Sequence, residues 1–346
     1  MDLGFKKAGY DIIWANDFQK EAVETYKKNI GEHIIHEDIS NLSITDIPKA
    51  EILIGGPPCQ SFSLAGRRNP NDKRGKLVWE YLKILRNLKP RCFIMENVIG
   101  LKSAVIPEGR KVIDELIEAF QEIGYHVFWE VLNMADYGIP QRRKRLFIIG
   151  FIDNVNFTFP AKTHSEDGNG YHKWVSVKEA IGDLPKATKE GIVYYDKEAF
   201  SDFQRIMRNT EGYTTEHIIP TLSELDMKII LSVPQGGNYM NVPDEISPIR
   251  IQKFKQTGGR TTCYGRLIET EPSYTINTYF NRPNSGCNIH YEENRTLTIR
   301  EAMRLQTFPD DFILVSNSIR AKHMMIGNAI PPMFAEILAN HIKKFL

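Results

Sequence analysis

Reactive or acidic side chains follow four successive strands that the sequence predicts in its first hundred residues: Asp17, Asp38, Cys59 and Glu96. In an open parallel sheet, ligands bind at the carboxyl ends of the strands. An acidic residue after a strand can also cap the next helix, and for Asp17 taken alone that role is equally plausible. Four such residues in succession favour a ligand site at this edge of the sheet.

Cys59 carries the most specific chemistry. It lies in Gly55-Gly56-Pro57-Pro58-Cys59-Gln60-Ser61-Phe62-Ser63, a loop of prolines and small residues that should expose the thiol. Cys92, inside an apolar run, is expected to be an ordinary buried small side chain. At a typical pKa of about 8.5, few cysteine side chains are thiolate at neutral pH. A nucleophilic Cys59 would therefore need cations nearby.

Alternating strand and helix patterns surround these residues. Strands are predicted near residues 11–15, 51–54, 91–95, 126–132 and 146–151, with helical periodicity between them and a helix of 112–120 that Gly124 can end. These repeated units predict an α/β fold with a mostly parallel sheet and helices on both faces. Residues 161–290, rich in Gly, Pro, Thr, Asn and Tyr, break the pattern and predict a smaller inserted domain. A capping box from Thr298 to Glu301 marks the return of helices, and a last helix begins at Pro331-Pro332.

Composition excludes several classes of protein. The 346 residues are 42% hydrophobic and 25% charged, which is typical of a globular protein with one large core and a smaller domain. None of the four cysteines forms a C-x-x-C pair, so a disulfide framework or Cys-rich metal site is not expected. No apolar run is long enough to cross a membrane, and no signal peptide is evident. A reduced cytoplasm fits best.

Positive charge gathers near the end of the inserted region. The net charge is only +1, so a nucleic-acid site must be a local patch. Residues 161–248 hold nine Lys/Arg against fourteen Asp/Glu, whereas residues 249–290 hold six against two, interleaved with aromatic residues. Cations can hold phosphates while aromatic and polar side chains meet bases. An ordinary basic face is the alternative, both here and for the basic run of Arg142 to Arg145.

The loop around Cys59 resembles the nucleophile motif of DNA cytosine-5 methyltransferases. Further segments resemble other motifs of that family, in family order and across almost the whole chain. They are Asp72-x-Arg74-Gly75-x-Leu77, Glu96-Asn97-Val98, Gln141-Arg142-Arg143-Lys144-Arg145, Arg295-Thr296-Leu297-Thr298-Ile299-Arg300-Glu301 and Gly327-Asn328-Ala329-Ile330-Pro331. Ile299 is a small departure, because the family often has Pro there.

The resemblance implies an S-adenosylmethionine-dependent, Rossmann-like methyltransferase domain (1–160 and 291–346) with an inserted target-recognition domain (161–290). Its activity would be DNA (cytosine-5-)-methyltransferase, acting on a cytosine flipped out of a specific duplex sequence, in a bacterial restriction–modification system. The thiolate of Cys59 would attack cytosine C6, which makes C5 able to accept a methyl group. Glu96 would act as a general acid near N3. The resemblance assigns Arg145 to the target base and Arg143 to the same pocket.

The same resemblance implies S-adenosyl-L-methionine as cofactor, no metal, and double-stranded DNA as the partner of a monomer. A restriction endonuclease would act on the same site without direct contact. The implied cofactor residues are Asp17, Phe18, Asp38, Ile39, Pro57, Leu77, Asn328 and Ala329. The expected DNA contacts are Gln60, Ser63, Arg74, Gln141, Arg250, Lys253, Lys255, Arg260, Arg266 and Arg282.

The start of the chain departs from the family pattern. A strand and a glycine turn precede a segment like Met1–Tyr10 in the family, and neither is found here. We therefore expect N-terminal truncation. Alternatively, a separate peptide supplies the strand, or the protein is a decayed relative of the family. Two further functions stay open: methylation of RNA, and DNA binding without catalysis.

Overall fold

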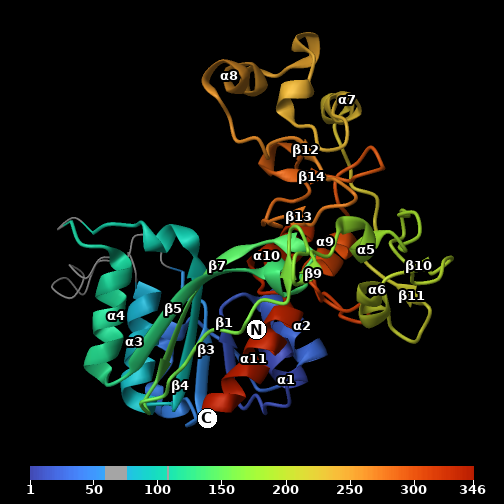
Figure 1. The fold of residues 1–346 in the computed structure, drawn as a ribbon. Coiled ribbons are helices and arrows are strands. Elements are labelled where there is room, and N and C mark those ends of the chain that lie inside the picture. The colour runs from blue at the N-terminus through green and yellow to red at the C-terminus, as the bar shows by residue number, and fades with distance from the viewer. Residues whose placement is uncertain (59–75, 107–108) are drawn as a thin grey trace. The chain divides into compact units, whose positions relative to one another are not determined.

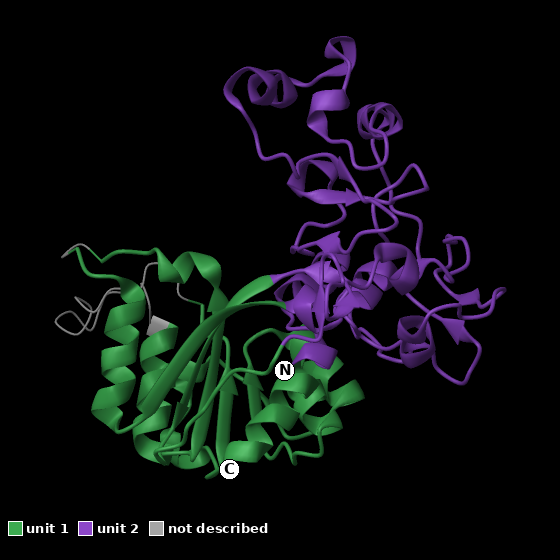
Figure 2. Ribbon diagram, viewed as in Figure 1, with its two compact units in different colours: residues 1–133, 144–161, 335–346 green, residues 134–143, 162–334 purple. Residues whose placement is uncertain are grey.

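The computed structural model describes residues 1–58, 76–106 and 109–346, so the predicted roles of Cys59, Gln60, Ser63 and Arg74 lie outside the described residues. The chain forms two compact units (Figure 2). Unit 1 comprises residues 1–133, 144–161 and 335–346, and unit 2 comprises residues 134–143 and 162–334. In the described part of the chain, no helix has the length and apolar character needed to span a membrane.

Unit 1 is an α/β unit built from the elements that the alternating pattern predicts. It contains α1 (Asp2–Lys7), β1 (Ala15–Asp17), α2 (Lys20–Asn29), β2 (Ile34–His36), β3 (Ile52–Gly55), α3 (Lys76–Leu88), β4 (Cys92–Val98), α4 (Val112–Ile123), β5 (His126–Asn133), β7 (Lys144–Phe151) and residues 335–342 of α11 (Pro332–Ile342).

The strands of unit 1 form two sheets. A four-stranded sheet has the order β3-β4-β7-β5, and β1 and β2 form a separate pair. The pairs β1–β2 and β3–β4 are parallel, as the sequence predicts, but β7 runs antiparallel to both β4 and β5. The parallel pairs bring the ends of β1 and β2 together, and likewise the ends of β3 and β4. Asp17 therefore lies next to the end of β2, and Glu96 lies next to the end of β3.

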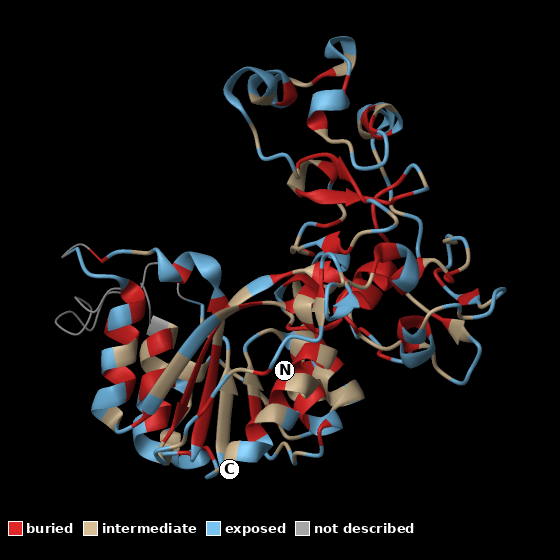
Figure 3. Cartoon of the chain, in the orientation of Figure 1, coloured by how far each residue is buried: buried red, intermediate tan, exposed pale blue. Residues whose placement is uncertain are grey.

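The core of unit 1 lies on both sides of the larger sheet. Strands β4 and β7 are buried along most of their length (Figure 3). Helices α3 and α4 cover one face with Leu82, Leu85, Leu116 and Phe120 (Figure 1). Helix α4 ends at Gly124, whose φ of 109° is in the left-handed region, as the sequence predicts.

Unit 2 consists of short elements joined by long connections. They are β6 (Gln141–Arg142), β8 (His164–Ser165), β9 (His172–Lys173), α5 (Val177–Ile181), β10 (Val193–Tyr194), α6 (Asp202–Met207), β11 (Tyr213–Thr214), α7 (Glu224–Ser232), α8 (Ile249–Thr257), β12 (Gly265–Arg266), β13 (Ser273–Tyr274), β14 (Cys287–Ile289), α9 (Ile299–Leu305) and α10 (Ile319–Asn328). The predicted capping box of Thr298 and Glu301 opens α9.

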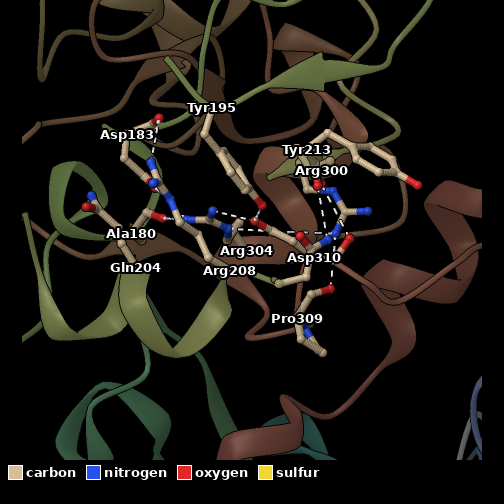
Figure 4. Close-up of polar contacts among 12 residues, drawn as sticks. Ala180, Asp183, Tyr195, Gln204, Arg208, Tyr213, Arg300, Arg304, Pro309 and Asp310 are labelled. Carbon is tan, nitrogen blue, oxygen red and sulfur yellow. Dashed lines mark hydrogen bonds and ion pairs between the residues drawn. The ribbon is translucent and has the colours of Figure 1, made fainter. Parts of the chain in front are cut away.

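A buried network of charges ties α9 to the α5–β11 region of unit 2 (Figure 4). The Arg304 guanidinium contacts both carboxylate oxygens of Asp310, at 2.6 and 2.5 Å, and Asp183 at 3.1 Å. Asp183 also accepts from Arg208 at 2.6 Å, and Asp310 accepts from the Tyr195 hydroxyl. These contacts explain why residues 291–334 cluster with unit 2, whereas the sequence places all of 291–346 in the catalytic domain.

Candidate active site

Asn97 anchors the loop that leads from β3 towards Cys59. Its side-chain Nδ2 donates to the Pro57 carbonyl at 2.9 Å, and its Oδ1 accepts from the Val98 amide at 3.0 Å. The Asn97 side chain is buried, and both contacts are partly shielded from water. Strands β3 and β4 are parallel, and Gly55 lies opposite Met95. The residues that follow Gly55 and Met95 therefore stay side by side. The first part of the Cys59 loop is therefore held against the end of β4.

Glu96 faces the same loop. A Cβ atom added to Gly56 would lie 3.2 Å from Glu96 Oε2, which is closer than most Cβ contacts, so a glycine leaves room for this carboxyl. The other oxygen, Oε1, lies 2.9 Å from Nε of Arg145. The structure thus places an acidic group beside the loop, three residues before Cys59, with a cation next to it.

Arg145 and Glu96 form a largely buried ion pair inside unit 1. Their side chains are only 15% and 13% exposed, and they come from the paired strands β7 and β4. Burial lowers the pKa of the Arg145 guanidinium, and Glu96 partly restores it. The sequence predicts their common pocket, although not the contact between them.

Arg143 does not share this arrangement. Its side chain is 1% exposed, and it donates to main-chain carbonyls of unit 2 at Ile276, Gly327 and Ala329. The resemblance places Arg143 in the same pocket as Arg145, whereas in this structure its guanidinium is held by main-chain carbonyls away from Glu96 and Arg145. The two arginines do not share one strand, because β6 ends at Arg142 and β7 begins at Lys144.

Four of the predicted cofactor residues, Asp17, Phe18, Asp38 and Ile39, lie at or just after the ends of the paired strands β1 and β2. Asp17 Oδ1 accepts from the Gln19 amide at 2.8 Å, and Asp38 Oδ1 accepts from the Ser40 amide at 2.9 Å. Burial raises the pKa of Asp17, while amide hydrogen bonds oppose this effect. Phe18 is 65% exposed between them along the chain. An exposed aromatic ring beside two carboxylates fits a purine nucleoside, which offers a flat face and ribose hydroxyls.

The remaining cofactor predictions fall on both units. Ile39, Pro57 and Leu77 are partly exposed in unit 1. In unit 2, Asn328 is the last residue of α10 and is exposed, and Ala329 follows as its C-terminal cap. No group of three or more metal-binding side chains is found in the part of the chain that the structure describes.

The predicted DNA contacts divide by burial. Arg250, Lys253, Arg260 and Arg282 are exposed in unit 2, and Lys255 pairs with Asp244 at 2.6 Å. Two residues are not available to DNA, which corrects the sequence-based prediction. Gln141 is fully buried against Leu305 and Gln306, and buried Arg266 donates to the carbonyls of Ile230, Val233, His290 and Glu293.

Comparison with known proteins gives a match over nearly the whole chain. The family described as C-5 cytosine-specific DNA methylase matches residues 1–344. The type II methyltransferase M.MthTI of Methanothermobacter thermautotrophicus is 36% identical and matches 100% of this chain and 94% of its own length. M.FnuDI of Fusobacterium nucleatum is 34% identical, with coverages of 100% and 92%, and M.NgoFVII of Neisseria gonorrhoeae is 33% identical, with 99% and 83%.

Solved structures show the same fold at lower identity. An E. coli prophage protein described as a DNA modification methyltransferase has a TM-score of 0.73 at 21% identity, covering 99% of this chain and 94% of its own. The Dnmt2 methyltransferase of S. pombe has a TM-score of 0.58 at 17% identity, with coverages of 99% and 95%. The matches cover nearly the whole of this chain and do not support the expected N-terminal truncation.

Proposed function

This chain belongs to the family of C-5 cytosine-specific DNA methylases, and from that premise we propose which of its residues carry out the reaction. Its function is that of a type II DNA (cytosine-5)-methyltransferase of a restriction–modification system. The match over residues 1–344 is the observation that carries this conclusion. The substrate is duplex DNA, from which the target cytosine has to be extruded at a cost of a few kcal/mol.

The chemistry needs a nucleophile, an acid and a way to hold the base. The Cys59 thiolate adds to cytosine C6, and the electrons displaced onto the ring make C5 nucleophilic. Glu96 supplies a proton or hydrogen bond at N3, where negative charge builds up. C5 then displaces the methyl group from the sulfur of the donor, and the C5 proton passes to water. The electrons of that C–H bond expel the Cys59 thiolate, and N3 returns its proton to Glu96. The position of Glu96 beside Gly56 supports its role, since this loop continues to Cys59.

Arg145 holds both Glu96 and the base in this proposal. Without substrate, its guanidinium is paired with Glu96 at 2.9 Å. A guanidinium has five N–H donors, so it can keep this contact and still donate to a carbonyl oxygen of the base. The pair then fixes the carboxyl of Glu96 for its proton transfer. Removal of Arg145 would leave a largely buried carboxylate without its cation.

S-adenosyl-L-methionine supplies an electrophilic methyl group when it is bound. In unit 1, Phe18 would stack on its adenine and Asp17 would accept from the ribose hydroxyls. Asp38 and Ile39 would contact the adenine edge, with Pro57 near the methyl group. Leu77, Asn328 and Ala329 would flank the methionine part. The exposed ring of Phe18 beside two carboxylates supports the nucleoside contacts.

Target recognition is assigned to the inserted region, residues 161–290, with a catalytic domain of 1–160 and 291–346. The exposed cations Arg250, Lys253, Arg260 and Arg282 would contact phosphates. The protein would work as a cytoplasmic monomer in a bacterium. A restriction endonuclease would share its DNA site without touching it.

Methyl transfer tests the proposal directly. The protein is incubated with duplex DNA and labelled S-adenosylmethionine, and 5-methylcytosine is mapped by sequencing. Transfer RNA serves as a competing substrate, and preferential RNA labelling would overturn the assignment to DNA. Cys59→Ser should abolish transfer and keep DNA binding. Cys92→Ser is the matched control, because Cys92 is fully buried in β4. Full activity of Cys59→Ser would remove Cys59 from the mechanism.

A further inference from the structure

We propose that Arg143 is a positioning residue for S-adenosylmethionine, which acts by holding the main chain on both sides of Asn328. The inference rests on the proposed function, because Asn328 is one of the residues assigned to the cofactor. It replaces the placement of Arg143 in the target-base pocket that the resemblance implies. Arg145 keeps its assignment to the target base, so Arg143 and Arg145 serve different ligands.

The contacts of Arg143 select one short segment. Its Nη2 donates to the carbonyls of Gly327 at 3.0 Å and Ala329 at 2.9 Å, and its Nη1 donates to Ile276 at 3.2 Å. The two Nη2 acceptors lie immediately before and after Asn328 in sequence. A guanidinium is planar and rigid, so it fixes the positions of all three carbonyls together. The flexible ammonium group of a lysine cannot reproduce this geometry.

Close packing holds the same segment from other directions. A Cβ atom on Gly327 would lie 2.5 Å from the Thr278 amide nitrogen and 2.6 Å from the Asn277 carbonyl carbon, so the two backbones touch at a glycine. Gln306 donates to the Ile326 carbonyl at 2.6 Å, and Gln141 donates to Gln306 at 3.0 Å. Residues 326, 327 and 329 are therefore fixed by buried contacts.

Asn328 is the exception within this segment. Its neighbours Ile326 and Gly327 are buried, whereas Asn328 is exposed. A side chain that projects from a main chain held on both sides has few positions open to it, so it can bind a ligand with a small loss of entropy. The buried side chain of Arg143 has no solvent-facing group of its own with which to meet a base. Its effect on a ligand must be indirect.

The test compares two buried arginines. Arg143→Lys and Arg143→Met remove the fixed geometry at 327–329. Arg266→Lys is the matched control, because Arg266 is also buried and also bonded to main-chain carbonyls, but at residues 230, 233, 290 and 293. Calorimetry measures S-adenosylmethionine binding, fluorescence anisotropy measures duplex DNA binding, and circular dichroism measures Tm. Hydrogen exchange of residues 326–330 is recorded without any ligand.

We expect the Arg143 variants to weaken S-adenosylmethionine binding about tenfold or more, the loss expected for a buried hydrogen-bonding group. DNA binding in the absence of cofactor should be unchanged, KM for the cofactor should rise, and exchange at 326–330 should speed up. Arg266→Lys should lower Tm and leave both the cofactor affinity and the exchange at 326–330 unchanged. An equal fall in Tm for both arginines with unchanged cofactor affinity would overturn the proposal. Weakened DNA binding alone would do so too, in favour of a base contact.

A double-mutant cycle asks whether Arg143 acts through Asn328. Asn328→Ala changes an exposed side chain and should weaken cofactor binding by itself. If the two residues form one unit, Arg143→Lys should have little further effect in the Asn328→Ala background. Additive losses would contradict the mechanism. Failure of the wild-type protein to bind S-adenosylmethionine would instead contradict the proposed function, and unchanged hydrogen exchange at 326–330 would contradict the role of Arg143 independently.

Discussion

Removal of one charge from the buried network of unit 2 should strongly destabilise the protein. The Asp310 carboxylate accepts hydrogen bonds from Nε and Nη2 of Arg304 and from the Tyr195 hydroxyl (Figure 4). The side chains of Asp310 and Arg304 are 0% exposed. Asp310→Asn preserves the shape of the side chain and one acceptor oxygen. It leaves Arg304 paired with the carboxylate of Asp183, and it removes the carboxylate that lies 3.7 Å from Nη1 of Arg300.

The magnitude follows from the burial of this pair. Breaking a buried ion pair on one side costs about 3–5 kcal/mol, because the remaining charge stays in a medium that solvates it poorly. For a folding unit of this size, each kcal/mol lowers Tm by roughly 2–4 °C. We therefore expect Tm to fall by roughly 6–20 °C in a thermal scan followed by circular dichroism. Unit 2 should unfold first, so its transition should separate from that of unit 1.

The control uses an ion pair of the same length on the surface. Arg205 and Asp202 also lie 2.6 Å apart, but their side chains are 56% and 96% exposed. Exposed pairs contribute about 0–1 kcal/mol, so Asp202→Asn should change Tm by no more than a few degrees. If Asp310→Asn and Asp202→Asn prove equally mild, burial does not set the strength of this network, and the reasoning fails.

Three further outcomes follow from the site and its surroundings. Glu96→Gln keeps a side chain that can hydrogen-bond but removes the carboxyl group that donates the proton. We expect kcat to fall strongly with little change in DNA affinity, and an unchanged kcat would refute the acid role of Glu96. Asn97→Ala removes the bond to Pro57, which should cost about 1 kcal/mol of stability but lower kcat roughly tenfold or more through a misplaced loop; equal kcat would contradict this. Burial, with Arg282 nearby, lowers the pKa of His323 to about 4. As pH falls below about 6.5, the unfolded chain binds a proton that the folded chain does not, so stability falls until about pH 4. His323→Phe should flatten urea-unfolding free energies over that range, and an unchanged pH profile would exclude His323 as a cause.

Much of unit 1 can be predicted from sequence because its signals are local. The apolar runs of β4, β5 and β7 and the helix stop at Gly124 lie within a few residues of their predicted places. The strand predicted at 11–15 is observed as Ala15–Asp17, because only these residues pair with β2. The sequence predicts a strand before Asp38 without giving its bounds, and the structure shows it as the three-residue β2. The helix α10 has no strong apolar pattern, so the sequence does not predict it.

The candidate site likewise has features that the local sequence predicts and contacts that it does not predict. The apolar run of residues 91–95 predicts Glu96 directly after a strand, whereas in the structure β4 continues to Val98, so Glu96 lies two residues before its end. The contact of Asn97 with Pro57 joins residues 40 apart, and Arg143 reaches carbonyls 133 to 186 residues away. Such contacts depend on the packing of distant segments, so residue type and local spacing carry no signal for them. The buried charges of Asp183, Arg304 and Asp310 escape prediction for the same reason, because charge predicts exposure.

Arginine shows why composition alone misassigns part of the DNA surface. Arg266 and Arg282 belong to the same basic stretch, and the sequence predicts the same role for both. A guanidinium can be buried only where acceptors meet its N–H donors. Arg266 finds four carbonyls, at separations of 24 to 36 residues, whereas Arg282 stays exposed with its guanidinium carbon 5.0 Å from the Tyr279 ring centroid.

The two arginines should therefore respond differently to the same change. Arg282→Gln should lower the salt dependence of DNA binding, with a slope of log Kd against log salt reduced by about 1, and leave Tm unchanged. Arg266→Gln leaves buried carbonyls without donors, so it should lower Tm and leave that slope intact. A smaller salt slope in Arg266→Gln, measured where the variant is fully folded, would mean that this side chain reaches DNA after all.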